Sequence, residues 1–217
     1  MEAATKIERL TISGPAGNLE GLLEWNPEWS PRQVAIVCHP HPLFGGTMHN
    51  KVVFRAAKGA IHLEMPTLRF NFRGVGHSEG QHAEGIGERD DARAALDYLA
   101  ERFPQTPVVM MGFSFGSVVA LAVGSADNRV NCLVGIGLPV NSSDFNFLRH
   151  VRKPKLLVQG THDRFGSRER VEELFLSLEE PKRLRFVEGA DHFLTGRLHE
   201  LQLEIQEFLQ GVMNPLQ

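Results

Sequence analysis

The sequence has few cysteines and no long apolar run. Its only cysteines, Cys38 and Cys132, fall in apolar, strand-like stretches, and we interpret both as small buried hydrophobic residues. No stretch approaches the roughly 20 apolar residues of a membrane span. The first six residues, Met-Glu-Ala-Ala-Thr-Lys, lack the apolar core that a signal peptide needs. These absences predict a soluble, cytoplasmic protein without a membrane partner.

The chain also lacks an excess of charge of either sign. Its 26 acidic and 23 basic residues give a formal net charge of −3, and no long charged block occurs. Nucleic acid or an anionic membrane is therefore not expected as the main partner. We expect one domain over residues 1–217, because a chain of this length buries about 70% of its unfolded surface in a single core.

Residues 112–116, Gly-Phe-Ser-Phe-Gly, join two apolar stretches of different character. The Val- and Met-rich run before them is typical of a buried strand, and the small and apolar residues after them suit a helix packed on a sheet. A turn centred on Ser114 would bring Gly112 and Gly116 together, so neither position tolerates a bulky side chain. The motif predicts a nucleophile elbow, with a strained, exposed serine at a helix N-terminus that favours an oxyanion.

Short apolar strands alternate with amphipathic helices along the rest of the chain. This alternation predicts an α/β protein with a mostly parallel, twisted sheet of about eight strands and helices on both faces. Besides the elbow and its helix, strands are expected at residues 7–12 and 19–25 (a hairpin), 34–38, 67–72, 108–111, 132–136, 155–159 and 184–187, and helices at 50–62, 87–103, 167–178 and 196–209.

An activated serine needs a neighbouring base, and that base needs an orienting acid. In this architecture the chain order is serine, acid, histidine. Asp163 follows a strand in a compact Gly-x-x-Asp turn, and His192 falls in the loop directly after the last strand. We therefore expect Ser114, Asp163 and His192 to converge at one edge of the sheet as nucleophile, acid and general base.

Two other aspartates compete with Asp163 for the role of the acid. Asp144 also follows a strand, and some proteins of this architecture take their acid from that earlier position. We prefer Asp163 because its turn is compact and comes straight after a strand. Asp191 adjoins His192 and would be poorly placed to bond its ring, so we interpret it as a turn residue.

Three histidines, His39, His41 and His49, cluster near the loop that follows the strand at residues 34–38. Their spacing is not that of a known metal motif, and no carboxylate joins them. We therefore expect neither a metal site nor an organic cofactor.

The same loop is expected to supply part of an oxyanion hole, which needs two backbone donors. Phe115, immediately after the nucleophile, offers one N–H group. Pro40 and Pro42 have no N–H, so His41 is the first donor available after His39. The N–H of Leu43 is the alternative, and the sequence does not separate the two.

These residues resemble those of the α/β-hydrolase superfamily along nearly the whole chain. Residues 112–116 resemble its elbow, Asp163 its acid turn, and residues 189–193 its histidine loop. Residues 69–80 look like its Arg-Gly-x-Gly-x-Ser loop. Residues 39–48 are similar to those of a group of small bacterial α/β-hydrolases related to the dienelactone hydrolase and serine esterase branches. The resemblance implies an α/β-hydrolase fold with a serine hydrolase site.

The chain departs from its relatives at two positions. Pro40 stands where many relatives have glycine, and Ser114 stands where true dienelactone hydrolases use cysteine, so that particular activity is not carried over. No long insertion lies between Ile136 and Lys155, where lid domains usually sit. The resemblance therefore implies no sizeable cap domain and an esterase acting on small or accessible acyl groups.

The function expected from these observations is that of a serine carboxylesterase that cleaves a small-molecule ester through an acyl-enzyme. A thioesterase or amide hydrolase with the same triad is an alternative, and so is a catalytically idle scaffold that binds a ligand or partner. An exposed edge strand or the final helix would support a homodimer. The side chains expected to line an apolar acyl pocket are Leu43, Phe44, Phe113, Leu138, Phe145 and Phe193.

Overall fold

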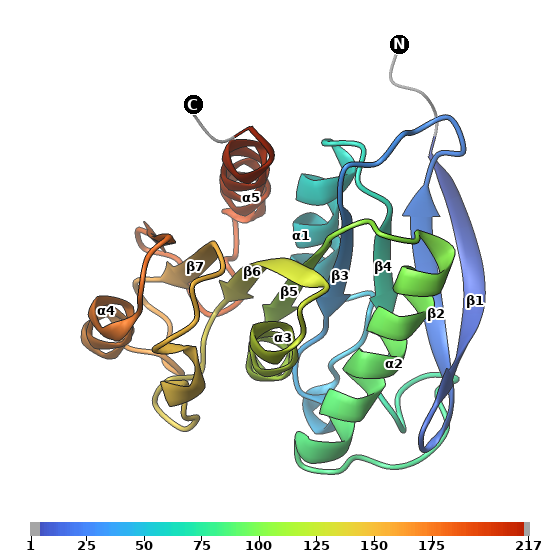
Figure 1. Cartoon of the computed structure of the whole chain (residues 1–217). Coiled ribbons are helices and arrows are strands. Elements are labelled where there is room, and N and C mark those ends of the chain that lie inside the picture. The colour runs from blue at the N-terminus through green and yellow to red at the C-terminus, as the bar shows by residue number, and fades with distance from the viewer. Residues whose placement is uncertain (1–4, 215–217) are drawn as a thin grey trace.

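Eight strands form one sheet in the computed structural model, which describes residues 5–214. Residues 1–4, the start of the segment expected to lack a signal-peptide core, lie outside the described residues, as do residues 215–217. The strand order is β1-β2-β4-β3-β5-β6-β7-β8 (Figure 1). The strands are β1 (Lys6–Gly14), β2 (Gly17–Trp25), β3 (Val34–Cys38), β4 (Thr67–Phe70), β5 (Val108–Phe113), β6 (Val130–Ile136), β7 (Lys155–Gly160) and β8 (Lys182–Val187).

The sheet is parallel except at one edge. β1 and β2 form the expected antiparallel hairpin, and β2 also pairs antiparallel with β4. All pairings from β4 to β8 are parallel, so the loops that follow these strands meet at a common edge. The predicted fold class, an α/β-hydrolase sheet of eight mostly parallel strands, is confirmed.

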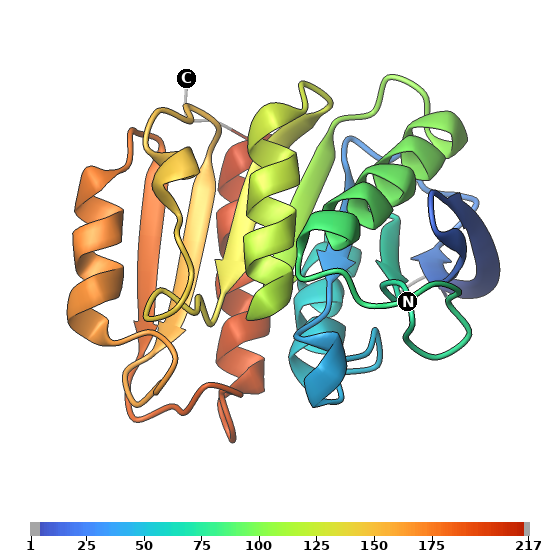
Figure 2. The ribbon, with the colours of Figure 1, turned by 90° about the horizontal axis from the view of Figure 1, so that it is seen from below.

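Helices cover both faces of the sheet. Figure 2 shows α2, α3 and α4 in front of it and α1 and α5 behind it. Each layer buries its own apolar cluster against the sheet. The helices are α1 (Lys51–Ile61), α2 (Ile86–Arg102), α3 (Phe115–Ala126), α4 (Arg168–Ser177) and α5 (Leu198–Met213), with short 3₁₀ turns η1 (Pro42–Phe44) and η2 (Asn146–Leu148).

Burial follows the predicted pattern of the central strands. β3, β5 and β7 are buried along their whole length, as expected of parallel strands covered on both faces. Both cysteines are free and fully buried, which confirms their interpretation as buried hydrophobic residues. Burial raises the pKa of both thiols, that of Cys132 to about 12.

Several elements differ from their predicted bounds by a few residues, and two of these differences have a cause that the structure shows. β4 ends at Phe70 and not at residue 72, because the Phe72 N–H donates to the ring of His39, 3.0 Å away, in place of a ladder partner. α5 continues to Met213, beyond the expected residue 209, where Val212 and Met213 still pack against the apolar cluster. Across residues 5–214, every helix falls short of the length and apolar character that a bilayer crossing requires.

Candidate active site

Ser114 lies on a tight turn between β5 and α3. Its backbone has φ of +55° and ψ of −123°, a conformation that costs a non-glycine residue on the order of 1–3 kcal/mol. The Ser114 N–H donates to the Ile136 carbonyl on β6, 2.9 Å away, which anchors the turn to the neighbouring strand. The strained serine predicted from the motif is therefore present.

The two flanking glycines explain how the chain makes this turn. A Cβ atom on Gly112 would lie 2.0 Å from the Gly116 carbonyl oxygen. A Cβ on Gly116 would lie 2.4 Å from the carbonyl oxygens of Cys38 and His39. The first glycine lets the turn close, and the second lets the end of β3 approach the start of α3. Neither contact leaves room for a side chain.

Three residues predicted from separate loops meet at this turn. Ser114 Oγ lies 2.9 Å from His192 Nε2, and His192 Nδ1 lies 2.7 Å from Asp163 Oδ2. A carboxylate only accepts hydrogen bonds, so His192 donates from Nδ1, and Nε2 is free to accept the serine proton. Asp163 and His192 are both buried, at 5% and 7% exposed, which shields their hydrogen bond from water. The arrangement can activate the serine hydroxyl.

The loop after β7 brings Asp163 to the histidine loop. The Asp163 N–H donates to Gly160 O in the expected turn, and its Oδ1 accepts the Phe165 N–H at 2.8 Å. A Cβ on Gly160 would meet the carbonyl oxygens of Ala190 and Asp191 at 2.4 and 2.6 Å, so glycine is needed for the two loops to touch. Asp191 itself accepts hydrogen bonds from its own loop and acts as the predicted turn residue.

The candidate oxyanion donors lie on adjacent segments. The rings of His41 and Phe115 are 4.9 Å apart, so the loop after β3 faces the start of α3. The Leu43 N–H donates to Nδ1 of His41 at 3.3 Å, which engages the alternative donor within its own 3₁₀ turn. Partial burial and the nearby His82 lower the pKa of His41, and a neutral ring is needed to accept from Leu43.

His39 fixes the start of this loop, a role that sequence reasoning missed. Its ring is fully buried, accepts the Phe72 N–H at Nε2 and bonds the Pro40 carbonyl with Nδ1 at 2.6 Å. Since Nε2 accepts, the ring is neutral with its proton on Nδ1. Burial lowers the pKa of His39 to about 4. The ring thus ties the candidate oxyanion loop to the end of β4.

Acid should weaken the fold through His39. Its pKa is about 4 when folded and 6.5 when unfolded, so the unfolded chain binds the proton first as the pH falls. This one group should lower the free energy of unfolding by about 3 kcal/mol between pH 6.5 and pH 4. Urea unfolding at a series of pH values measures how the free energy of unfolding changes with pH. His39→Gln, which lacks the titrating group, is the comparison and should show a smaller change. Equal slopes in the two proteins over this window would contradict the prediction.

Aromatic rings surround the histidine. Phe113 is fully buried with its ring centre 5.0 Å from that of His192, and Phe165 lies 4.5 Å from it on the other loop. Phe193 is 42% exposed and also contacts His192. Leu43 and Phe44 project from the 3₁₀ turn η1 with 69% and 85% exposure. Phe165 and Phe193, both partly exposed, form an apolar rim beside the His192 ring, and the Phe44 ring lies 4.8 Å from that of His41 on the candidate oxyanion loop.

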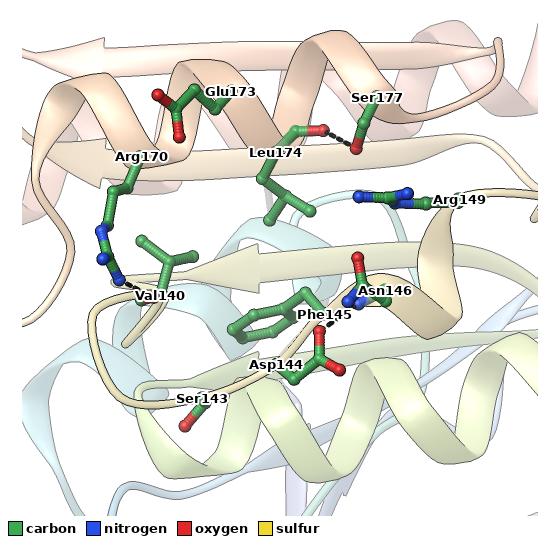
Figure 3. Close-up of a pocket in the computed structure, with 10 residues that line it drawn as sticks. All are labelled: Val140, Ser143, Asp144, Phe145, Asn146, Arg149, Arg170, Glu173, Leu174 and Ser177. Atoms are coloured by element: carbon green, nitrogen blue, oxygen red, sulfur yellow. Dashed lines mark hydrogen bonds between the residues drawn. The ribbon is translucent and has the colours of Figure 1, made fainter.

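Two of the residues predicted to line the acyl pocket are placed elsewhere. Phe145 is 3% exposed and lines an open cavity of about 410 Å³ between α4 and the segment after β6, and none of Ser114, Asp163 and His192 lines that cavity. Figure 3 shows Phe145 and Asp144 in this cavity. Leu138 is fully buried in the apolar core. The segment after β6 packs against α4 and places Phe145 there. Phe145 is therefore not assigned to the acyl pocket.

Asp144, the alternative acid, caps its own segment. Its Oδ1 accepts the Asn146 N–H at 2.8 Å. The His192 ring bonds Asp163 and not Asp144, as the compact turn predicted. Within residues 5–214 no three His, Cys, Asp or Glu side chains are grouped so as to hold a metal ion. The His41 ring lies 4.9 Å from that of His82, whose Nδ1 is 2.8 Å from the carboxylate of the buried Glu88.

The sheet order and the elbow at the end of β5 define an α/β-hydrolase. Between β6 and β7 the chain forms only the short 3₁₀ turn η2 among residues 137–154, and so carries no lid there. A family model described as an alpha/beta hydrolase domain matches residues 36–215, and the chain belongs to this family.

Similar proteins extend along almost the whole chain. The protein RP471 of Rickettsia prowazekii is 35% identical over 211 residues, which are 93% of this chain and 88% of that protein. A structure described as an alpha-beta serine hydrolase homologue from Coxiella burnetii is 36% identical, with a TM-score of 0.88 over 96% of this chain and 100% of that chain. XC6422 from Xanthomonas campestris, described as a serine hydrolase without a lid, is 32% identical. The two structures align with a TM-score of 0.88 over 99% of this chain and 98% of that chain.

Proposed function

We propose that this protein is a serine carboxylesterase that works through an acyl-enzyme. The observation that carries the proposal is the continuous hydrogen-bonded chain from Ser114 Oγ through the His192 ring to Asp163. A serine in this setting is a nucleophile for acyl carbonyls. The two similar structures described as serine hydrolases support the reaction class.

Each step of the proposed reaction is assigned to a residue of the site. Ser114 Oγ attacks the ester carbonyl while His192 Nε2 takes its proton. The N–H groups of Phe115 and His41 bind the oxyanion. The tetrahedral intermediate collapses, and His192 returns the proton to the departing alcohol. Water then attacks the acyl-enzyme by the same route and releases the acid, while Asp163 holds the histidine tautomer.

The apolar rim favours esters with apolar acyl groups. Phe165 and Phe193 are partly exposed beside the His192 ring, and Leu43 and Phe44 are exposed on the candidate oxyanion loop. Apolar acyl groups gain from contact with such a surface at roughly 25 cal/mol per Å² removed from water. The absence of a lid between β6 and β7 leaves the rim accessible to substrates of different lengths.

Ester hydrolysis and active-site labelling together test the proposal. We expect turnover of p-nitrophenyl esters whose kcat/KM varies with acyl length, and a fluorophosphonate probe should modify Ser114, as read by mass spectrometry of the labelled peptide. Matched oxyester, thioester and anilide substrates then rank the leaving groups by the rate acceleration over uncatalysed hydrolysis. A larger acceleration for the thioester or the anilide than for the oxyester would favour the thioesterase or amidase alternative. Failure of the probe to label Ser114 would favour the idle scaffold.

A further inference from the structure

The side chain of Gln159 makes hydrogen bonds to the loops around the candidate site, in addition to the backbone pairing of its strand. It is the penultimate residue of β7, and its side chain is fully buried. Its Oε1 accepts the Leu138 N–H at 2.7 Å. Its Nε2 donates to Asp163 Oδ2 at 2.8 Å and to the Gly166 carbonyl at 3.1 Å. The side-chain amide therefore links the loop after β6 to the loop that carries Asp163.

The chemistry of the partners fixes the orientation of this amide. The backbone N–H of Leu138 can only donate, and the Asp163 carboxylate and the Gly166 carbonyl can only accept. A flipped amide would set oxygen against oxygen at Asp163 and leave the Leu138 N–H unbonded. The close approach also depends on Gly166, because a Cβ there would lie 2.7 Å from Gln159 Nε2.

Asp163 Oδ2 therefore receives two donors at once, the His192 Nδ1–H and the Gln159 Nε2–H. Its other oxygen accepts the Phe165 N–H. The two flanking bonds prevent the carboxylate from rotating about its own axis. The Gln159 N–H also withdraws negative charge from the oxygen that faces the histidine, and so weakens the hold of Asp163 on an imidazolium.

We propose that Gln159 is a positioning residue that orients Asp163 and sets the pH at which His192 becomes protonated. The proposal rests on the proposed function, in which Asp163 and His192 are the acid and the base. Because Gln159 acts through Asp163, its loss should change the pH at which His192 takes up a proton, as well as kcat. A role in packing alone would change the free energy of unfolding and leave that pH unchanged.

Gln159→Met tests the proposal with a side chain of similar length that cannot donate. Without the donor, Asp163 holds the imidazolium more tightly, so the acid limb of the kcat/KM profile should move up by about one pH unit. We expect kcat to fall about tenfold with KM nearly unchanged, because binding contacts are not removed. Gln202→Met is the matched control: Gln202 is a buried glutamine on α5 whose Oε1 accepts from Arg55.

Gln159→Leu provides a second variant should the methionine fail to fold. Its side chain likewise cannot donate to Asp163, so the acid limb should move up as it does in Gln159→Met. A profile in either folded variant that superimposes on the wild type would overturn the proposal.

An NMR titration of the His192 ring separates this proposal from the proposed function, since it needs no substrate. A higher titration midpoint in Gln159→Met than in the wild type supports the role of Gln159, even if no ester is hydrolysed. An unchanged midpoint overturns that role, even if the esterase activity is present. Gln202→Met should titrate as the wild type does.

Discussion

Replacing Ser114 by alanine should lower kcat for ester hydrolysis by on the order of 10⁶-fold, to the level that binding and the oxyanion donors alone provide. The substitution removes only the hydroxyl whose proton His192 Nε2 is placed to accept. KM should change little, since the apolar rim is untouched. Initial rates with a p-nitrophenyl ester, at enzyme concentrations high enough to detect the residual rate, measure the effect.

Ser125→Ala is the matched control for this experiment. Ser125 lies on α3, the helix that starts after Ser114, and its hydroxyl donates to the Ala122 carbonyl within that helix. Its loss should leave kcat within about twofold of the wild type. Circular dichroism and thermal unfolding should show both variants folded. Full esterase activity in Ser114→Ala would refute the proposed nucleophile.

Asp163→Asn should lower kcat by about 10⁴-fold while the protein stays folded. An amide NH2 in place of Oδ2 faces the His192 Nδ1–H and the Gln159 Nε2–H with a donor, and in place of Oδ1 it faces the Phe165 N–H. The histidine is then driven to the tautomer that carries its proton on Nε2, which cannot take the serine proton. Pre-steady-state and steady-state rates on the same ester measure the loss.

Asp144→Asn tells the two candidate acids apart. Asp144 caps its own segment beside the cavity of Figure 3, and this change keeps the acceptor that bonds the Asn146 N–H. Its kcat should therefore remain within about twofold of the wild type. A large loss in Asp144→Asn together with normal rates in Asp163→Asn would reverse the assignment of the acid.

The fold and the elbow could be predicted because their signals are local. Gly112 and Gly116 flank the serine at the spacing that the turn demands, and the contacts of both confirm the reason. The buried parallel strands are continuous apolar runs, which are hard to mistake for surface elements. The end of β4 could not be predicted, because it depends on a hydrogen bond to His39, far away in the chain.

The surroundings of the site were harder to predict, because they depend on where loops go after leaving the sheet. Phe145 follows a strand and looks like any aromatic residue beside a site, but its segment turns under α4. Gln159 adjoins the Gly-x-x-Asp turn, which is the one signal that could have pointed to it. Its partners Leu138 and Gly166 come from separate loops, and no local pattern marks them.

Ser114 has to meet two conflicting requirements, a backbone conformation that suits glycine and a side chain that carries a hydroxyl. Its positive φ suits glycine, which adopts it without strain, and so selection for stability alone would favour glycine at this position. Glycine carries no hydroxyl, and so selection for chemistry excludes it. The protein retains a residue that its own turn disfavours, so the rest of the fold has to supply the stability that this choice removes. The free energy of unfolding that remains to absorb destabilising mutations elsewhere in the chain is smaller by the same amount.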